Sequence, residues 1–395
     1  MSTYTDASLI YYPSGYKAGK AYSLKPTDGS GDLTFTRAST ATRVNESGLI
    51  ESVATGVPRI DFTGGGCGKL LLEPQRTNVS DNSENFSDWI QVGFTQTLNS
   101  TISPSNTLTA DTFFESAGTT HIAFKDFSVT SGLNYTISFF LKSQGGRNVR
   151  ILGSTGFSGS VDVNLSTGAI LAGSGIVETF INGWYRVSIN CNATTSTGRI
   201  ILYSLDGTSS VEGDPTKGII CWGAQVEQGS YPTSYIPTTT TAVTMVGDAC
   251  LTTNLQSSSI IGATQGTFFL NTTKTTASTW INQRIFETGT TTRSFLLDNS
   301  GGQIRLRVWD ASSVGPTITT SGLVEGFVKY LIKWDGTNVK VFANGVLQGS
   351  SAAPSYAYNT YSAYESTAYS NNAINQFLFF PTALSDAECI ALTTL

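Results

Sequence analysis

Alternating apolar residues constrain the fold of this chain more than any other feature of its sequence. In the stretch GWYRVSINCNA, which begins at Gly183, apolar side chains recur at every second position: Tyr185, Val187, Ile189 and Cys191. Because successive side chains of a β-strand point to opposite faces of a sheet, this period of two predicts a strand with one buried face. Similar stretches recur at short intervals, so we predict an all-β protein.

The residue content agrees with an all-β fold. Only 13% of the 395 residues are charged, whereas glycine, serine, threonine and asparagine are abundant. Serine, threonine and asparagine compete with the helical backbone for hydrogen bonds, and glycine adds entropy to the unfolded chain, so this balance disfavours helices. At 39% hydrophobic residues the chain is too apolar to stay disordered. Its length predicts two or three domains.

Charge and hydropathy argue against two classes of partner. The formal net charge is −5, and no run of lysine and arginine exceeds two residues. A nucleic-acid binder needs a cationic footprint that neutralises phosphates, so we expect no nucleic-acid partner. No apolar run approaches the roughly 18 residues of a membrane span, and the first residues lack the basic and apolar parts of a signal peptide. We therefore expect neither membrane insertion nor Sec-dependent export.

The five cysteines are widely scattered and form no CxxC pair. This pattern favours reduced, mostly buried thiols over disulfides or metal ligands. The residues concerned are Cys67, Cys191, Cys221, Cys250 and Cys389.

Residues 1–80 are poorly periodic, with short predicted strands at Leu33–Arg37, Pro58–Phe62 and Lys69–Pro74. We interpret the charged residues of this segment as Arg–carboxylate pairs that fasten a region with little apolar surface. A clamp for a substrate or phosphate is the alternative. The residues are Arg37, Arg43, Arg59 and Arg76, with Glu46, Glu51, Asp61 and Glu73.

Two sequence segments between Arg37 and Trp89 carry a specific signal, because several spaced motifs within them follow one another in a fixed order. They are RASTATRVNESGLIESVATGVPRIDF and GKLLLEPQRTNVSDNSENFSDW. Together they resemble an opening found in phage virion proteins ahead of receptor-binding or capsid-decorating modules. The resemblance implies that residues 1–80 form an N-terminal attachment or oligomerisation segment that contacts other virion proteins. It also implies a location on the virion surface.

Predicted strands follow one another closely between residues 81 and 237. Thr136–Ser143 has the pattern of a buried strand with polar ends, Val161–Leu165 alternates, and Asp206-Gly207 marks a tight turn. Such spacing indicates a β-sandwich. The order FSDW, LNYTISFFLKS, GWYRVSI, CWGAQVEQGSYPTSYIPT resembles the carbohydrate-binding jelly-roll modules of phage tail and head fibres. The resemblance implies that residues 81–237 form a jelly-roll domain, closed by the strand that carries Trp222, Gln225 and Glu227.

Residues 238–262 are predicted to be a linker. The run Thr238–Thr241 and the prolines before it favour an extended, stiff spacer that holds the flanking domains apart. Exchange of this segment between the chains of a trimer is a further hypothesis.

Residues 263–395 have a pattern of their own. Residues 327–349 read as a three-strand meander with Asp335-Gly336 and Asn344-Gly345 in its turns. A strand that ends at Phe380 precedes a short helix capped by Ser385. This series is similar to the laminin-G-like/concanavalin-like sandwich, in which a strand pair like DGTNVKVFANG and a terminal helix like ALSDAE recur. The similarity implies a fold and names no ligand.

Catalytic chemistry has little support in the sequence. The chain has one histidine, His121, and neither a G-x-S-x-G elbow nor a cysteine in an active-site frame, so we expect a structural histidine. The glycine-rich piece TGGGCGK lacks the GK[ST] ending of a phosphate loop. Candidate carboxylate pairs for sugar cleavage are Glu212 with Asp214, which has the pattern of a turn, and Asp298 with Asp310. We predict no enzyme and no cofactor; structural calcium stays an unassigned alternative.

Aromatic side chains are the stronger lead toward a ligand. Exposed rings stack on the apolar faces of sugars, while amide and charged groups bond the hydroxyls. In PSYAYNTYSAYESTAYSNN few aliphatic residues separate the tyrosines, which fits an exposed surface and core positions equally. The candidate glycan contacts are Tyr356, Tyr358, Tyr361, Tyr364, Tyr369, Trp280 and Trp309. Trp184, Trp222 and Trp334 lie inside strand patterns and are predicted to be core.

Residue patterns and resemblances together predict a non-enzymatic phage virion surface protein of tail-fibre or head-fibre type. Its jelly-roll and laminin-G-like sandwiches would follow an irregular N-terminal attachment segment. The expected partners are other virion proteins and bacterial surface glycans, bound with the avidity of a homotrimer. Two alternatives stay open. One is a structural capsid-decorating or tail-scaffold protein that docks other virion proteins, and the other is a polysaccharide depolymerase.

Overall fold

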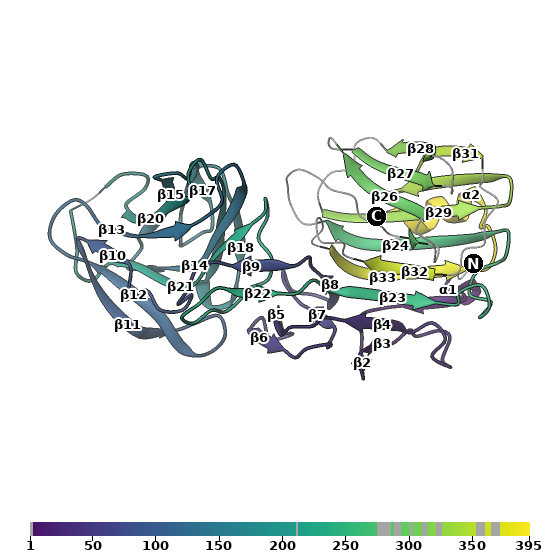
Figure 1. The fold of residues 1–395 in the computed structure, drawn as a ribbon, viewed down its shortest axis with the longest axis horizontal. Coiled ribbons are helices and arrows are strands. Elements are labelled where there is room, and N and C mark those ends of the chain that lie inside the picture. Colours follow the sequence, from purple (N-terminus) through teal and green to yellow (C-terminus); the bar gives the residue numbers. More distant parts are fainter. Residues whose placement is uncertain are drawn as a thin grey trace.

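The computed structural model describes residues 3–210, 212–274, 286–287, 294–300, 303–309, 314–320, 326–352, 360–364 and 372–395. Within them the chain forms two β-rich lobes that lie along the long axis of the molecule (Figure 1). The helical elements of this part are α1 (Thr3–Asp6), a 3-10 turn at Ile181–Gly183, and α2 (Asp386–Thr393). The all-β prediction is confirmed. The particular sandwich types, jelly roll and laminin-G-like, stay predictions.

The first lobe is a sandwich of two antiparallel sheets. One has the order β10 (Ile90–Val92), β13 (Ile122–Ser128), β20 (Thr197–Leu205), β15 (Asn148–Ser154), β16 (Ser160–Val163), β17 (Ile170–Gly173). The other has the order β11 (Phe94–Ile102), β12 (Leu108–Glu115), β21 (Gly218–Gln228), β14 (Asn134–Gln144), β19 (Tyr185–Asn192), β18 (Ile176–Thr179). The core lies between them. The predicted alternation on β19 is confirmed, because Tyr185, Val187, Ile189 and Cys191 are all buried in this core.

The second lobe is built on an 8-stranded sheet that joins the two ends of the chain. Its order is β31 (Val346–Ala352), β30 (Asn338–Ala343), β29 (Gly326–Trp334), β24 (Gly266–Lys274), β33 (Asn372–Phe380), β8 (Lys69–Leu72), β7 (Arg59–Asp61), and β1 (Leu9–Tyr11) pairs with β33. The predicted three-strand meander is confirmed as β29, β30 and β31.

Two smaller sheets complete the described part of this lobe. A 5-stranded sheet has the order β2 (Tyr16–Lys17), β3 (Lys20–Ala21), β4 (Leu33–Thr36), β23 (Ala249–Thr253), β32 (Thr360–Tyr364). A 4-stranded sheet has the order β25 (Phe286–Glu287), β26 (Ser294–Ser300), β27 (Gln303–Trp309), β28 (Val314–Thr320). Phe35 and Cys250 of the 5-stranded sheet pack against Phe268 and Phe379 of the 8-stranded sheet, so a core lies between the two. The predicted core position of Trp334 is confirmed here.

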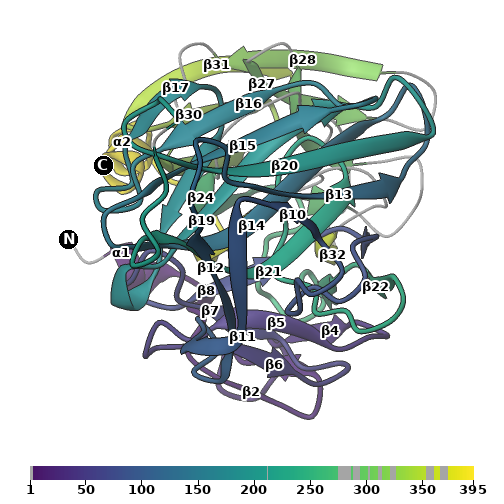
Figure 2. The same cartoon turned by 90° about the vertical axis from the view of Figure 1, so that its left-hand side faces the viewer.

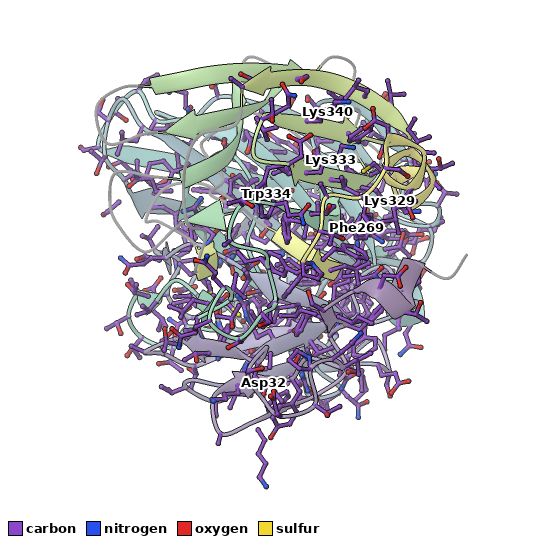
Figure 3. All side chains as sticks on the ribbon, turned by 90° about the vertical axis from the view of Figure 1, so that its right-hand side faces the viewer. Asp32, Phe269, Lys329, Lys333, Trp334 and Lys340 are labelled. Atoms are coloured by element: carbon purple, nitrogen blue, oxygen red, sulfur yellow. The ribbon has the colours of Figure 1, made fainter. Side chains whose placement is uncertain are left out.

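Helix α2 covers the other face of the 8-stranded sheet, where its Cys389 packs against the sheet. Three lysines from β29 and β30 surround the helix (Figure 3): Lys329, Lys333 and Lys340. Lys340 Nζ lies 2.7 Å from Asp386 Oδ2, and Lys333 Nζ donates to the carbonyl of residue 384 at 2.7 Å. The predicted cap is confirmed, because Ser385 and Glu388 form a reciprocal capping box. In the described residues, no helix combines the length and the apolar character that crossing a membrane requires.

The N-terminal segment contributes strands to both lobes and lies along one side of them (Figure 1 and Figure 2). β1, β7 and β8 extend the 8-stranded sheet, and β2 to β4 extend the 5-stranded sheet. The hairpin of β5 (Ala41–Val44) and β6 (Ile50–Val53) packs instead on the first lobe, where Val44 and Ile50 contact a cluster that contains Trp184 and Trp222. The predicted domain borders stay a prediction. The structure adds that residues 1–80 complete sheets whose other strands lie far along the chain.

The chain crosses between the lobes twice, and the two crossings pair with each other. β9 (Arg76–Asn78) follows β8 and pairs antiparallel with β22 (Val243–Met245), which precedes β23. Thr77 and Thr244 also join through their hydroxyls at 2.8 Å. Part of the stretch predicted as an extended spacer is therefore strand: β22 and β23 both fall within residues 238–262.

Candidate functional site

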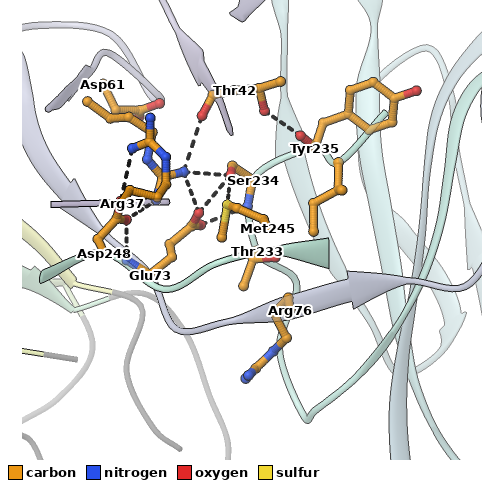
Figure 4. Close-up of polar contacts among 12 residues, drawn as sticks. Arg37, Thr42, Asp61, Glu73, Arg76, Thr233, Ser234, Tyr235, Met245 and Asp248 are labelled. Carbon is orange, nitrogen blue, oxygen red and sulfur yellow. Dashed lines mark hydrogen bonds and ion pairs between the residues drawn. The ribbon is translucent and has the colours of Figure 1, made fainter. Parts of the chain in front are cut away.

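Four buried charged side chains lie close together where the chain crosses between the lobes (Figure 4). Arg59 Nη1 lies 2.6 Å from Glu73 Oε2, and its Nη2 donates to Asp248. Arg37 Nη1 lies 3.0 Å from the other oxygen of Asp248. The predicted Arg–carboxylate pairing within residues 1–80 is confirmed for Arg59 with Glu73 and for Arg43 with Glu51, which lie 2.7 Å apart. Arg37 and Arg76 pair instead with acids from beyond residue 80, Asp248 and Glu227.

This cluster also fixes the segment that leaves β21. The backbone N–H of Ser234 donates to Glu73 Oε1 at 2.7 Å, and its hydroxyl donates to Oε2 at 2.6 Å. Burial raises the pKa of Glu73, but the Arg59 guanidinium and the Ser234 donors outweigh it and bring the pKa below its ordinary value. Each charge in the cluster has an opposite charge beside it. We therefore assign the cluster a structural role.

The sheet that contains β14 and β19 carries a band of polar side chains on its outer face. We call this band the polar face; its residues alternate with core positions on three neighbouring strands and are Asn134, Thr136, Ser138, Arg186, Ser188, Asn190, Asn192, Gln225 and Glu227. Strand register brings them together, because Thr136 faces Asn190 on one side and Glu227 on the other. The polar face is thus a single patch made by strand pairing.

The chain itself covers the inner part of the polar face. Gln225 Oε1 accepts from the backbone of Ile236 at 2.7 Å. Glu227 accepts from the backbone of Thr233 at 2.9 Å and from its hydroxyl at 2.6 Å. Burial raises the pKa of Glu227 despite these donors. Gln225 and Glu227 therefore anchor the segment after β21 on the sheet, which agrees with their predicted place in this domain.

The outer part of the polar face presents three exposed asparagines, Asn134, Asn190 and Asn192. Asn190 Oδ1 accepts from the Thr136 hydroxyl at 2.9 Å, and Asn134 Oδ1 accepts from Asn192 Nδ2 at 3.1 Å. Within the described residues, no side-chain bond engages the Nδ2 groups of Asn134 and Asn190 or the Oδ1 of Asn192. These amides can therefore donate to and accept from a ligand.

A ring and a guanidinium lie on the segments next to β14. Arg76 Cζ lies 5.1 Å from the centroid of the half-buried Tyr231 ring, and Arg76 Nε lies 3.8 Å from Glu227 Oε2. The backbone N–H of Gly229 donates to the carbonyl of Asn134 at 3.0 Å, which brings this segment beside β14. The edge of the polar face therefore combines an aromatic ring, a cation and amides.

Arg186 lies at the buried end of the polar face. Its Nη2 donates to the Ser138 hydroxyl at 3.1 Å, and its Cζ lies 5.4 Å from the Phe140 ring centroid. In the described part of the chain, its Nε has no hydrogen-bond partner. The cross-strand partner of Arg186 is Glu178 on β18, whose pKa is raised by burial and lowered to a lesser extent by the Arg186 charge.

The predicted aromatic contacts of the second lobe are not tested by this structure. Tyr361 and Tyr364 lie on β32 and Trp309 lies on β27, but their side chains are outside the described set. Tyr356, Tyr358, Tyr369 and Trp280 lie outside the described residues altogether. All of them stay predictions.

The structure also describes the tryptophan, histidine and cysteine residues for which the sequence predicted a structural role. Trp184 and Trp222 are buried in the first lobe, as predicted. His121 is buried and bonds the carbonyl of Ser116 through Nε2 at 2.9 Å, which agrees with a structural role. Cys67 is exposed and the other four cysteines are buried and free, as the sequence pattern favours.

Of the two carboxylate pairs considered from sequence, the structure describes the side chains of one, Glu212 and Asp214. Glu212 accepts from the backbone of Gly118 at 3.0 Å, 94 positions away. Asp214 accepts from the backbone of Thr216 at 2.9 Å, which is a turn contact. Asp298 lies on β26, and Asp310 lies outside the described residues. Where the chain is described, no group of three or more His, Cys, Asp and Glu side chains is arranged to hold a metal ion. Structural calcium stays an untested prediction.

Sequence reasoning missed the polar face, although a signal for it exists. Asn134, Thr136 and Ser138 alternate with Tyr135, Ile137 and Phe139, the core positions of β14. Polar residues at every second position of a strand whose other positions are core predict a polar outer face. The covering segment after β21 and the approach of Arg76 have no such signal, because both depend on tertiary contacts.

Comparison with known proteins gives weak structural similarities. No protein family and no curated protein matches the chain. The CBM40 domain of the IT-sialidase from Ruminococcus gnavus, bound to α2,3-sialyllactose, has 19% identity and a TM-score of 0.28 over 34% of this chain and 84% of its own. Domain 4 of AbnA, a GH43 extracellular arabinanase from Geobacillus stearothermophilus, in complex with arabinotriose, has 14% identity and a TM-score of 0.31 over 42% and 84%.

A third similar structure is a tail fiber protein from a phage of E. coli. It has 9% identity and a TM-score of 0.23 over 79% of this chain and 40% of its own. At TM-scores this low, none of these similarities carries an argument about function.

Proposed function

We propose that this chain is a non-enzymatic virion surface protein, of tail-fibre or head-fibre type, that holds glycans of the bacterial surface. The observation that carries the glycan part is the outer edge of the polar face. Exposed Asn134, Asn190 and Asn192 lie there, and the bond from the Gly229 N–H to the Asn134 carbonyl brings the segment of Tyr231, whose ring contacts the Arg76 guanidinium, beside β14. The virion part rests on the sequence resemblance of residues 37–89.

The chemistry of this edge suits a sugar. A hydroxyl group both donates and accepts, and a primary amide offers both functions on one planar group, so neighbouring amides can bond successive hydroxyls. A tyrosine ring can contact the apolar face of a sugar ring at the same time. The aromatic residues of the second lobe are proposed as a separate set of contacts.

Weak contacts of this kind become effective when several copies act together. Linked sites raise the apparent affinity by about two to four orders of magnitude when geometry allows them to bind at once. A homotrimer is part of this proposal. Sedimentation of the purified chain tests it, and a monomer at all accessible concentrations would remove the avidity argument.

The glycan part is tested by binding to host surface polysaccharide. We expect the double variant Asn190→Ala/Asn192→Ala to bind about tenfold more weakly than wild type, because two exposed hydrogen-bonding groups are lost. The matched control is Thr95→Ala/Thr97→Ala, which removes two exposed polar side chains from β11 at the edge of the same sheet. If both double variants bind like wild type, the polar face is not the binding surface.

A second candidate function is docking of other virion proteins. Exposed aliphatic side chains line two edge strands of the first lobe and the strand beside them: Ile90, Val92, Leu98, Ile102 and Leu108. Exposed aliphatic residues without aromatic rings among them favour a protein contact over a sugar contact. Imaging of the assembled particle separates the two functions, because a scaffold role requires this edge to be covered by another subunit.

A further inference from the structure

The hairpin of β2 and β3 holds two lysines side by side at the tip of the 5-stranded sheet. Lys17 pairs with Lys20 across a two-residue turn formed by Ala18 and Gly19. Both turn residues have positive φ, 49° and 73°, the combination that matches the twist of a two-residue β-hairpin. Cross-strand partners project to the same face, so the turn places two ammonium groups next to each other.

These lysines belong to the outer face of the 5-stranded sheet. Ala21, Leu33 and Phe35 point into the core and are buried. Lys20 instead pairs with Thr34, which is exposed and pairs in turn with Leu251. We call the outer residues Lys17, Lys20, Tyr22, Thr34 and Thr36 the hairpin face. Tyr22 is 39% exposed.

The positive charge of the hairpin face is not neutralised within the described residues. Asp32 accepts from the backbone and hydroxyl of Ser23, and Asp28 accepts from Ser30. These two carboxylates therefore stabilise local turns of the chain. No ion pair of the described residues joins Lys17 or Lys20. The contrast is with Lys333 and Lys340, which both pair with Asp386 of the C-terminal helix (Figure 3).

We propose that the hairpin face binds an acidic polysaccharide. The chain carries a net charge of −5, so an acidic polymer is repelled by most of the molecule and attracted where Lys17 and Lys20, without an ion pair among the described residues, stand together. Exposed Tyr22 on the same face supplies a ring for sugar contact, and Thr34 and Thr36 supply hydroxyls. This inference deepens the proposed function, on which its choice of a glycan rests, but its site is separate from the polar face.

The test measures retention of the full chain on immobilised alginate, a carboxylated polysaccharide, with neutral dextran as reference. We expect wild type to prefer alginate and to lose binding as salt concentration rises, because exposed charges are screened. Lys17→Gln/Lys20→Gln should bind alginate about tenfold more weakly, the combined effect of two exposed charge contacts. The matched control is Lys142→Gln/Lys217→Gln, which removes the same charge from the first lobe and should bind like wild type.

Three results would overturn the inference. One is alginate binding that is unchanged in Lys17→Gln/Lys20→Gln, and another is equal retention on alginate and dextran. The third is lysine-dependent binding to phosphatidylserine-containing vesicles without binding to alginate, which would identify a membrane surface as the ligand. The proposed function fails on different evidence, since Asn190→Ala/Asn192→Ala leaves the hairpin face intact.

Discussion

Arg59 donates from Nη2 to Asp248 although 189 positions of sequence separate the two residues. Both side chains are fully buried. Asp248 also accepts from Arg37 at 3.0 Å and from the backbone of Glu73 at 2.9 Å. One carboxylate therefore joins elements from both crossings between the lobes.

Removal of this carboxylate should strongly destabilise the fold. Asp248→Ala leaves Arg37 buried without an ion-pair partner and Arg59 with one partner in place of two. Loss of one member of a buried pair costs about 3–5 kcal/mol, because the remaining charge stays desolvated and uncompensated. Urea unfolding followed by tryptophan fluorescence measures the change. Asp126→Ala is the control, since the pair it forms with Arg199 is exposed and should matter little. Equal unfolding midpoints for the two variants would contradict the structural role of Asp248.

Acid should weaken the first lobe through Glu115. Its carboxylate accepts from Arg147 Nε at 2.8 Å and from Arg147 Nη2 at 2.9 Å. Burial raises the pKa of Glu115, but the hydrogen bonds from Arg147 and Ser204 outweigh it, and the pKa lies below its ordinary value of 4.5. A carboxyl whose folded pKa is below its unfolded pKa stabilises the fold above the unfolded value and loses that contribution as pH falls.

The pH dependence separates this effect from simple packing. We expect Glu115→Gln to be less stable than wild type at neutral pH, and the difference to shrink as pH falls below about 4.5. Thermal unfolding between neutral pH and about pH 3 measures it. A constant difference across this range would show that the charge of Glu115 does not contribute.

The turn of the β5–β6 hairpin should tolerate no side chain at Gly48. A Cβ there would lie 2.5 Å from Cγ2 of Ile181, and the residue has φ +77°. Gly56 has a similar φ of +71° with nothing within 4 Å of its Cβ position, which makes it the matched control. We expect Gly56→Ala to cost about 1 kcal/mol from backbone strain and Gly48→Ala about 2–4 kcal/mol from strain and overlap. Chemical denaturation measures both, and equal losses would show that the hairpin can move away from Ile181.

The C-terminal helix should depend on its cap. Ser385→Ala removes the side-chain acceptor for the N–H of Glu388 and should cost about 1 kcal/mol, whereas Ser385→Asp should keep most of the stability. Differential scanning calorimetry compares the two variants. A larger loss in the aspartate variant would mean that the like charges of Asp386 and Glu388 dominate the first turn.

Much of the local structure follows from the sequence pattern. The alternation of Tyr185, Val187 and Ile189 predicts β19, and the Asp335-Gly336 and Asn344-Gly345 pairs predict the turns of the meander. The pattern did not indicate that β8 would pair with β33, or that Arg37 would find its partner at Asp248. Local spacing contains no information about which distant strand or charge will be adjacent.

The candidate site shows the same division. The sequence shows that Asn134, Thr136 and Asn190 are polar residues at alternate strand positions. Their assembly into one patch depends on the register of β14 with β19 and β21. The Arg76 and Tyr231 contact depends on how the two crossings between the lobes meet.

The sequence by itself determined that this chain forms amphipathic strands, tight turns and a capped terminal helix, because these depend on residues within a few positions of one another. Only the tertiary structure decided that residues 1–80 complete the second lobe, that the β5–β6 hairpin covers part of the first, and that Arg59 meets Asp248. The physical reason is that strand pairing and burial of charge depend on closure of long loops. The free energy of that closure is shared among many contacts and is encoded in no single stretch of the chain.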